Sequence, residues 1–294
     1  MNLSKVPGFD LITSKIAKKS GVDWRDLTVH ALLHLPRFSD EQLRTRIVVA
    51  NEVYRLAARI KELRSGYEYL EHFSGRPRLE RTIVEQVDET LAKVILERFH
   101  YIGTYRKNST HVGVFSYEKN VKRIAGLTTI SEFDLEHIKE YLPREIERSA
   151  VKVLSRIYSF NWVPKNFGSY MLGRVFDFIR SNQPETELLL TYLNPNLGFK
   201  GATYRASNWS LFAEEEVHNY IYLDKNYITL RALVEAFATD NMEMLKTKLG
   251  DRLSFSLQPL EPLKIYRYFL YKHEREKYER DERIYRIRKT PSIA

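Results

Sequence analysis

The spacing of apolar residues changes near residue 100, and this change divides the chain into two kinds of structure. Before it, apolar residues recur every three or four positions, as on the buried face of an amphipathic helix. After it, short apolar runs alternate with turn residues, which is typical of strands and loops. We therefore expect an α+β protein: a helical N-terminal region over 1–85, a mixed β-sheet flanked by helices over 86–272, and a charged C-terminal tail over 273–294.

Two amphipathic helices are predicted in the first hundred residues. The first begins at a capping box, with Ser39 as the N-cap and Gln42 three residues later. It ends before Gly66, and its apolar face is predicted to contain Leu43, Ile47, Tyr54, Ala57 and Ile60. The second helix is predicted over 83–99.

Strands and helices alternate after residue 100. The segment 111–131 predicts a hairpin that turns at Glu118-Lys119-Asn120. A strand is predicted over 148–160, followed by a helix that begins near Phe167. The remaining predicted elements are strands over 187–193 and 217–223, a helix over 228–237, and a last strand over 262–272.

Charge and composition limit the partners that the chain can have. The net charge is +9 and the pI is about 9.4, which favours a phosphate-bearing partner such as nucleic acid, a nucleotide or a membrane surface. A basic balance is also common among proteins that bind none of these. The absence of cysteine excludes disulfides and Cys-ligated zinc. Since no apolar run approaches the ~18 residues that span a bilayer, we expect a soluble, cytoplasmic chain without a membrane partner.

A strand, a Pro-Lys-Asn turn and a helix follow one another around residue 164. The first turn of such a helix presents free N–H groups and the positive end of the helix dipole, which together suit an anion such as a pyrophosphate. Lys165, Asn166, Gly168 and Ser169 are the candidate donors. An ordinary capped helix explains the same spacing equally well, because neither GxGxxG nor a Walker pattern is present.

His100 stands where the second predicted helix turns into a loop. An imidazole suits general-base work or metal ligation, although a histidine at a helix end more often interacts with the helix dipole. The other histidines show no metal-binding spacing, so no metal site is predicted. The acidic run 132–147 is best interpreted as a solvated helix, with Asp134 as a candidate for orienting a base or ligand.

The stretch 188–212 carries an unusual density of planar, hydrogen-bonding side chains. Gly198 and Gly201 give the loop backbone freedom, and a single helical turn then places Tyr204 and Asn208 on one side at a spacing of four. Arg205 and Trp209 lie beside them. This combination favours a site that holds a flat, polar group by stacking and hydrogen bonding.

The segment LTYLNPNLGFKGATYRASNW resembles the signature of Mom-type DNA-modification proteins of bacteriophages, within the acyltransferase-like (GNAT) superfamily. Four further features match the same family in the same order: the His100-Tyr101 pair, the hairpin, Ser155-Arg156, and the Pro-x-Asn-x-x-Ser helix start. The likeness covers about residues 92–240, and the N-terminal third and the basic tail lie outside it.

The resemblance implies a splayed, acyltransferase-like sheet whose central V holds an acyl-CoA or related acyl donor. The donor's pyrophosphate would lie at the helix start near Asn166–Ser169, and Arg156 would also bind the donor. An iron is implied in some family members. His100 would be a base or ligand, with Tyr101 or Tyr204 as proton donor to the leaving thiolate. Asn208, counted among the catalytic residues, and Trp209 would help hold an extruded base, and Tyr192 and Arg205 would also bind the substrate.

The leading hypothesis is a transferase that adds an acyl, aminoacyl or carbamoylmethyl-type group to a DNA base, which itself can already be modified. If phage-encoded, it would work in the host cytoplasm. Two alternatives are a non-catalytic DNA-binding protein of the same fold in phage defence and a small-molecule N-acyltransferase. The basic segments at both ends would contact phosphate or form ordinary solvated surface.

Overall fold

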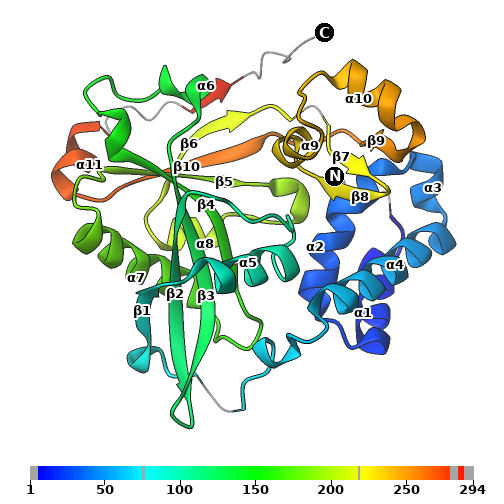
Figure 1. Cartoon of the computed structure of the whole chain (residues 1–294), viewed down its shortest axis with the longest axis horizontal. Coiled ribbons are helices and arrows are strands. Elements are labelled where there is room, and N and C mark those ends of the chain that lie inside the picture. The colour runs from blue at the N-terminus through cyan, green and yellow to red at the C-terminus, as the bar shows by residue number, and fades with distance from the viewer. Residues whose placement is uncertain (1–5, 75–76, 218, 279–283, 288–294) are drawn as a thin grey trace.

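A large mixed sheet with helices on both faces stands beside a helical N-terminal region, as the sequence predicts (Figure 1). The computed structural model describes residues 6–74, 77–217, 219–278 and 284–287. Eight strands form the large sheet in the order β1-β2-β3-β4-β5-β10-β6-β11, and a second sheet has the order β8-β7-β9. The α+β fold class with a helical N-terminal region is therefore confirmed.

The elements have the following bounds. The large sheet contains β1 (Ile83–Gln86), β2 (Ser109–Glu118), β3 (Val121–Glu132), β4 (Val151–Ser159), β5 (Leu188–Leu193), β10 (Leu263–Phe269), β6 (Ser210–Glu215) and β11 (Tyr285–Ile287), and the small sheet contains β8 (Asn226–Ile228), β7 (Ile221–Leu223) and β9 (Leu253–Phe255). The helices are α1 (Phe9–Ser20), α2 (Trp24–His34), α3 (Asp40–Arg44), α4 (Arg46–Arg64), α5 (Glu89–Arg98), α6 (Glu136–Lys139), α7 (Phe167–Asn182), α8 (Ala202–Ala206), α9 (Leu230–Phe237), α10 (Met242–Leu249) and α11 (Lys272–Tyr278).

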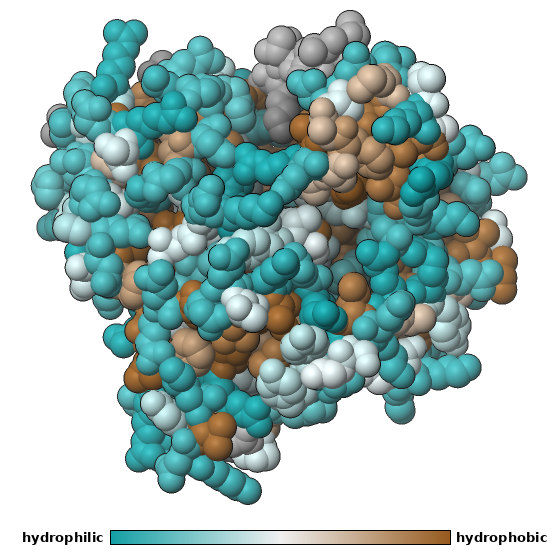
Figure 2. Space-filling view, in the orientation of Figure 1, coloured by the Kyte–Doolittle hydropathy of each residue, from teal (hydrophilic) through white to brown (hydrophobic). Residues whose placement is uncertain are grey.

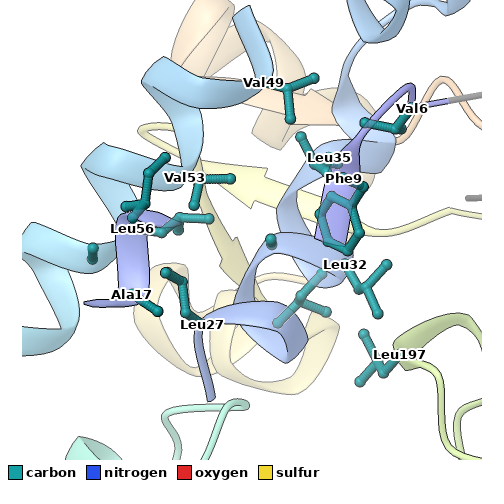
Figure 3. Packing of buried hydrophobic residues seen from close by; sticks show 14 of the residues in the cluster. Val6, Phe9, Ala17, Leu27, Leu32, Leu35, Val49, Val53, Leu56 and Leu197 are labelled. Carbon is teal, nitrogen blue, oxygen red and sulfur yellow. The ribbon is translucent and has the colours of Figure 1, made fainter. Parts of the chain in front are cut away.

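Helices α1 to α4 enclose a hydrophobic cluster of their own. Figure 3 shows Phe9 of α1 beside Leu32 and Leu35 at one end of this cluster, and Leu27 of α2 beside Ala17 and Leu56 at the other. Leu197, which follows β5 in a 3₁₀ turn at Pro195–Leu197, also lies in the cluster and is 2% exposed. The N-terminal helices therefore support the loop that follows β5.

The predicted helix after Ser39 is in fact two helices. The capping box is present, because the Ser39 hydroxyl and the Gln42 side chain each accept the other residue's backbone N–H. Thr45 then takes an extended conformation between α3 and α4 and resets the helical phase. Ile47 and Tyr54 are consequently exposed, which corrects their prediction as buried residues, whereas Leu43, Ala57 and Ile60 are buried as predicted.

The helix predicted over 83–99 was wrong in its first part. Ile83 begins a strand, β1, which pairs antiparallel with β2. Helix α5 starts only after Asp88, whose carboxylate accepts the Leu91 N–H. Strand pairing with a distant segment overrides the local helical spacing here. Strand β1 crosses the predicted boundary at residue 85.

Helices cover different faces of the large sheet (Figure 1). Met171, Val175 and Ile179 of α7 pack against Val112 and Leu189 on one face. On the other face, α5 packs against β2 and β3 through a separate cluster that contains Ile95, Phe115 and Leu127. The predicted hairpin is confirmed, with Lys119 and Asn120 at positive φ in its turn.

The C-terminal part contains elements that the sequence did not predict. Strand β10 is not the last strand, because β11 pairs in parallel with β6 and buries Ile287 at 2% exposure. Part of the predicted tail thus joins the sheet, while residues 279–283 and 288–294 lie outside the described residues. The strand predicted over 217–223 is shorter in the structure, where it is β7. In this part of the chain the sequence also did not predict β6, β8, β9 and α10.

Apolar side chains of the small sheet's helices reach the surface. Figure 2 shows a brown patch where Figure 1 draws α9 and α10, and Leu230 and Met244 are 44% and 49% exposed.

Asp134 forms ion pairs with Arg106 and Arg231 and so ties α9 to the large sheet, rather than orienting a catalytic base. Within the described residues, no helix is both long enough and apolar enough to cross a bilayer.

Candidate functional site

The parallel strands β4 and β5 separate at the centre of the large sheet and leave a cavity between them. Strands β4 and β5 pair only as far as Leu154 and Thr191. Beyond that point β4 stays paired with β3 and β5 stays paired with β10. The register between β3 and β4 shifts at Thr129/Ile130, and such a bulge bends a strand. This splayed arrangement was the one expected.

We call this space the donor cavity. It has a volume of about 420 Å³. Its walls come from β4 beyond Leu154, from Thr191 to Asn194, from the 198–204 loop and α8, from the start of α7 and from the turn after α5. Of the predicted site residues, it brings together His100, Tyr101, Arg156, Gly168, Tyr192 and Tyr204. Segments more than one hundred residues apart therefore meet at one place.

Arg156 and the more exposed Lys200 are the cations that line the donor cavity, and Arg156 lacks a carboxylate partner in the part of the chain that the structure describes. Its Nη1 donates to the Ser155 carbonyl at 2.7 Å and its Nη2 to the Thr104 hydroxyl at 3.1 Å. Its Nε is buried without a partner among the described residues. Burial lowers the pKa of Arg156, yet a guanidinium keeps its proton in proteins. An uncompensated positive charge thus faces the cavity.

His100 is a neutral hydrogen-bond donor in this geometry. It is 5% exposed, and burial together with nearby Arg156 holds its pKa well below the usual range. Its Nδ1 accepts the Ile102 backbone N–H at 3.2 Å, so the ring proton must sit on Nε2. A neutral ring cannot act as a charged partner of the helix dipole. A general-base role would require the other tautomer and the loss of the Ile102 bond.

Tyr101 and Tyr204 remain protonated near neutral pH, because burial raises the pKa of each phenol. Tyr204 donates to the Thr191 hydroxyl at 3.3 Å, since Thr191 uses its own proton on the Leu154 carbonyl. The Tyr101 hydroxyl has no hydrogen-bond partner among the described residues, and its ring stacks on His100 at 4.5 Å. Tyr101 is therefore the better placed of the two to donate to a ligand.

Tyr192 contributes its ring to the cavity, but its hydroxyl is committed elsewhere. That hydroxyl donates to the buried carboxylate of Glu215 at 2.7 Å, and burial and Glu215 raise its pKa. The same carboxylate lies 3.2 Å from Nε2 of His137. Glu215 is not part of the cavity lining, and none of the described residues that form the lining is an Asp or Glu. The donor cavity is thus rich in proton donors and lacks a carboxylate base.

Three residues near the end of the LTYLNPNLGFKGATYRASNW segment are not part of the donor cavity's lining. Trp209 is 4% exposed and packs among Phe176, Tyr204 and Tyr268, so its indole supports Tyr204 from behind. Helix α8 ends at Ala206, so Asn208 does not continue it; Asn208 is exposed at φ +60° in the turn to β6. The expected side-by-side placement at a spacing of four therefore does not occur. Arg205 is also exposed and donates to the Lys200 carbonyl at 2.6 Å.

The helix start at α7 forms one end of the donor cavity. Asn166 takes φ +69° and its side chain does not cap the helix, while Gly168 lines the cavity next to Thr203. Lys165 and Asn166 are exposed beside this end, and Ser169 donates its hydroxyl proton to the Asn166 carbonyl at 3.0 Å. The Phe167 N–H donates to the Pro164 carbonyl at 3.1 Å, so the backbone N–H groups of Gly168 and Ser169 are the ones available for an anion at the cavity mouth.

The sequence interpretation missed Phe199 and Thr191. Phe199 is 38% exposed, lies at the cavity wall and contacts the Tyr101 ring at 5.8 Å between centroids. Its position between Gly198 and Gly201, both at positive φ, was a usable signal. Thr191 was marked by being the single polar residue in the apolar run of β5.

The iron implied by the resemblance does not fit the residues present. Among the described residues, no three His, Cys, Asp or Glu side chains gather to form a metal-binding group. His100 has Arg156, Tyr101 and Tyr158 as neighbours rather than carboxylates. We derive no step through a metal.

Lowering the pH from 7.5 to 5 is expected to destabilise the protein, although most carboxylates are still ionised in this range. Burial lowers the pKa of His34 to about 3 and holds those of His30 and His100 well below 6.5. Below about pH 6.5 these histidines bind protons in the unfolded chain but stay neutral in the folded chain. Their contribution to the free energy of unfolding is therefore fully present above this pH and is lost as the pH falls. Each histidine contributes about 1.4 kcal/mol per pH unit. Melting temperatures between pH 7.5 and 5 measure this fall.

The slope with pH is the informative quantity for that prediction. His34→Gln should reduce the dependence of melting temperature on pH, since it removes one of the three groups. His72→Gln, at an exposed histidine, is the matched control and should leave the slope unchanged. An equal melting temperature at both ends of the pH range would contradict neutral, buried imidazoles.

The model of one protein family, described as the Mom protein family, matches residues 81–292. The chain belongs to the Mom family. The match is wider than the stretch that carries the resemblance and takes in the strands from β1 to β11. Helices α1 to α4 precede it. No curated protein sequence matches the chain.

Solved acetyltransferase structures resemble this Mom-family chain in fold. Spermidine/spermine N-acetyltransferase SpeG from Vibrio cholerae, in complex with manganese ions, has a TM-score of 0.40 at 7% identity and covers 67% of this chain and 98% of its own. The ribosomal-protein-S18-alanine N-acetyltransferase from Escherichia coli has a TM-score of 0.37 at 7% identity, with 64% and 94% covered. Identities of this size concern the fold alone.

Proposed function

We propose that the protein is a DNA-modifying transferase that moves an acyl, aminoacyl or carbamoylmethyl-type group from a coenzyme A-type donor to a DNA base. Membership of the Mom family supports this proposal, as does the splayed sheet with a cavity at its centre. The observation that carries it is Arg156: a guanidinium without a carboxylate partner among the described residues, facing a cavity lined by protonated phenols.

The lining of the donor cavity fits a reaction that builds negative charge on an oxygen. When an acceptor nitrogen attacks the carbonyl carbon of an acyl donor, charge develops on the carbonyl oxygen. Arg156, the Tyr101 hydroxyl and His100 Nε2–H are donors that can stabilise this charge. Preorganised donors in a partly dry site act strongly because little reorganisation is needed.

Tyr101 can also account for the proton transfers when the group moved from the thioester is acyl or aminoacyl. A C–N bond forms and the C–S bond of the thioester breaks, so the acceptor nitrogen loses one proton and the leaving thiolate gains one. Tyr101 is protonated and free to give its proton to the thiolate, and the proton from the acceptor nitrogen restores it. Tyr204 would hold the loop in place through Thr191.

The donor's phosphates would bind at the start of α7. The uncapped first turn, the dipole of a 16-residue helix and exposed Lys165 together favour an anion there. Met171, one turn farther along α7, lines the same cavity and would contact the apolar arm of the donor. The net charge of +9 supports DNA as the acceptor-bearing polymer.

Mass spectrometry of nucleosides tests the proposed function. DNA from cells that express the protein should contain a nucleoside with added mass, and DNA from cells that express Tyr101→Phe should contain far less of it. Calorimetry should show coenzyme A binding, weakened up to about fivefold by Lys165→Glu, since an exposed ion pair contributes about 1 kcal/mol at most. DNA binding should be unchanged by that substitution.

The outcomes separate the alternatives. Coenzyme A binding with acetylation of small amines and no change in DNA would favour a small-molecule N-acyltransferase. DNA binding without coenzyme A binding or a new nucleoside would favour a non-catalytic DNA-binding protein. An equal loss of coenzyme A and DNA binding in Lys165→Glu would mean that the anion at α7 is a nucleic-acid phosphate.

A further inference from the structure

A second cavity lies on the other side of the turn that follows α5. Its volume is about 420 Å³, and the residues His100, Tyr101 and Ile102 line both cavities. The remaining walls come from α2, α4, the end of α5 and the β7–β8 hairpin. We call it the acceptor cavity. A molecule bound in it would meet the donor cavity's contents across only these shared residues.

Residues before the family match build one wall of the acceptor cavity. His30, His34 and Arg59 precede residue 81 and face the cavity from α2 and α4. His34 donates from Nδ1 to the His30 carbonyl at 2.8 Å and accepts the Tyr227 backbone N–H on Nε2 at 3.2 Å. Since both ring nitrogens are hydrogen-bonded, His34 holds β8 against α2 and fixes the shape of this cavity wall.

The lining offers planar rings and two charged side chains without a hydrogen-bond partner among the described residues. The His30 ring stacks on His34 at 6.4 Å with an interplanar angle of 20°, and Tyr227 presents a third ring. Arg59 and Glu97 make no hydrogen bond or ion pair among the residues that the structure describes. Glu97 is the one carboxylate that lines either cavity in the described part of the chain.

The acceptor cavity supplies a charged group of a kind that the donor cavity lacks. An exocyclic amino group needs a hydrogen-bond acceptor, and the donor cavity has no carboxylate. Glu97 supplies one, and Arg59 can bind a phosphate of the same nucleotide. Flat walls and a volume of this size suit a single extruded base, because ligand pockets commonly measure about 300–1,000 Å³.

We propose that the acceptor cavity receives the DNA base that is modified, extruded from its strand, with Glu97 bound to its amino group and Arg59 to its phosphate. This inference rests on the proposed function. It gives helices α2 and α4 a part in substrate recognition. Because His100, Tyr101 and Ile102 line both cavities, the target amine would approach the donor's carbonyl beside these three residues.

Photo-crosslinking locates the base. Single-stranded oligonucleotides that carry 5-iodouracil or 8-azidoadenine are irradiated with the full-length protein, and the labelled peptides are identified by mass spectrometry. We expect labels on the peptides that contain His30 to His34 and Tyr227. Arg59→Gln should lower the yield at least tenfold, and Lys61→Gln, an equal change of charge at an exposed position of the same helix, should not.

The results distinguish failure of this inference from failure of the proposed function. If DNA is bound and modified but the label falls on Phe199 or elsewhere in the donor cavity, the inference is wrong and the proposed function stands. The same holds if Arg59→Gln and Lys61→Gln give equal yields. If the protein neither binds nor modifies DNA, the proposed function fails and this inference fails with it.

Discussion

Replacement of Arg156 by methionine is expected to lower the yield of modified base by about a hundredfold to a thousandfold, the usual effect of removing one donor to a developing oxyanion. The melting temperature should stay the same or rise. Arg156 has no carboxylate partner among the described residues, so its removal leaves no opposite charge stranded and relieves the cost of holding a guanidinium partly out of water. Nucleoside mass spectrometry and thermal unfolding of the same preparation measure both effects.

Two further variants show whether charge or geometry matters at Arg156. Arg156→Lys keeps the charge but loses the two-pronged geometry that reaches Ser155 and Thr104, so it should recover only a part of the activity. Arg205→Met removes an exposed arginine from α8 and should leave activity unchanged. Full activity of Arg156→Met, or loss of its fold, would contradict the role given to this residue.

Replacement of Arg64 by methionine is expected to cost about 3–5 kcal/mol of unfolding free energy. Arg64 is 3% exposed and pairs with Asp26 at 2.8 Å and with Glu71 at 2.5 Å. Its guanidinium also lies over the Phe99 ring at 5.0 Å. Removing it would leave the two partly buried carboxylates without their cation, and an unpaired buried charge strongly destabilises the folded state. Urea unfolding followed by circular dichroism gives the value.

A double variant identifies the stranded carboxylate as the cause. Arg64→Met combined with Asp26→Asn should lose less stability than the sum of the two single variants, because the second change removes a charge that the first leaves unpaired. Lys61→Met, an exposed cation one turn earlier on α4, should change stability by less than about 0.5 kcal/mol. Simple additivity of the two single changes would argue against a coupled network.

Local signals in the sequence predicted local structure well. The capping box at Ser39 depends on two hydrogen bonds within four residues, and the hairpin depends on Lys119 and Asn120, which tolerate positive φ. Both were predicted correctly because the deciding interactions are between near neighbours. Strand β11 was not predicted, because its pairing with β6 joins segments seventy residues apart and its charged surroundings hid Ile287.

The candidate site was predicted in part for the same reason. The His100-Tyr101 pair, Arg156 and Gly168 line one cavity, as the order of motifs led us to expect. Trp209 was expected at the substrate and lies in the core, since no local pattern tells a buried indole from an exposed one. The acceptor cavity was not foreseen, because its walls meet only when α2, α5 and β8 are packed together.

Leu197 anchors the 198–204 loop to the N-terminal helices. Its side chain lies beside Leu32 of α2 in the cluster that α1 to α4 enclose (Figure 3), and Gly198, immediately after it, begins the segment that lines the donor cavity. A change in how α2 packs would therefore shift Phe199 and Tyr204 without touching either. Substitutions that alter which substrate is accepted can thus arise deep inside the first sixty residues, far from any atom that reacts.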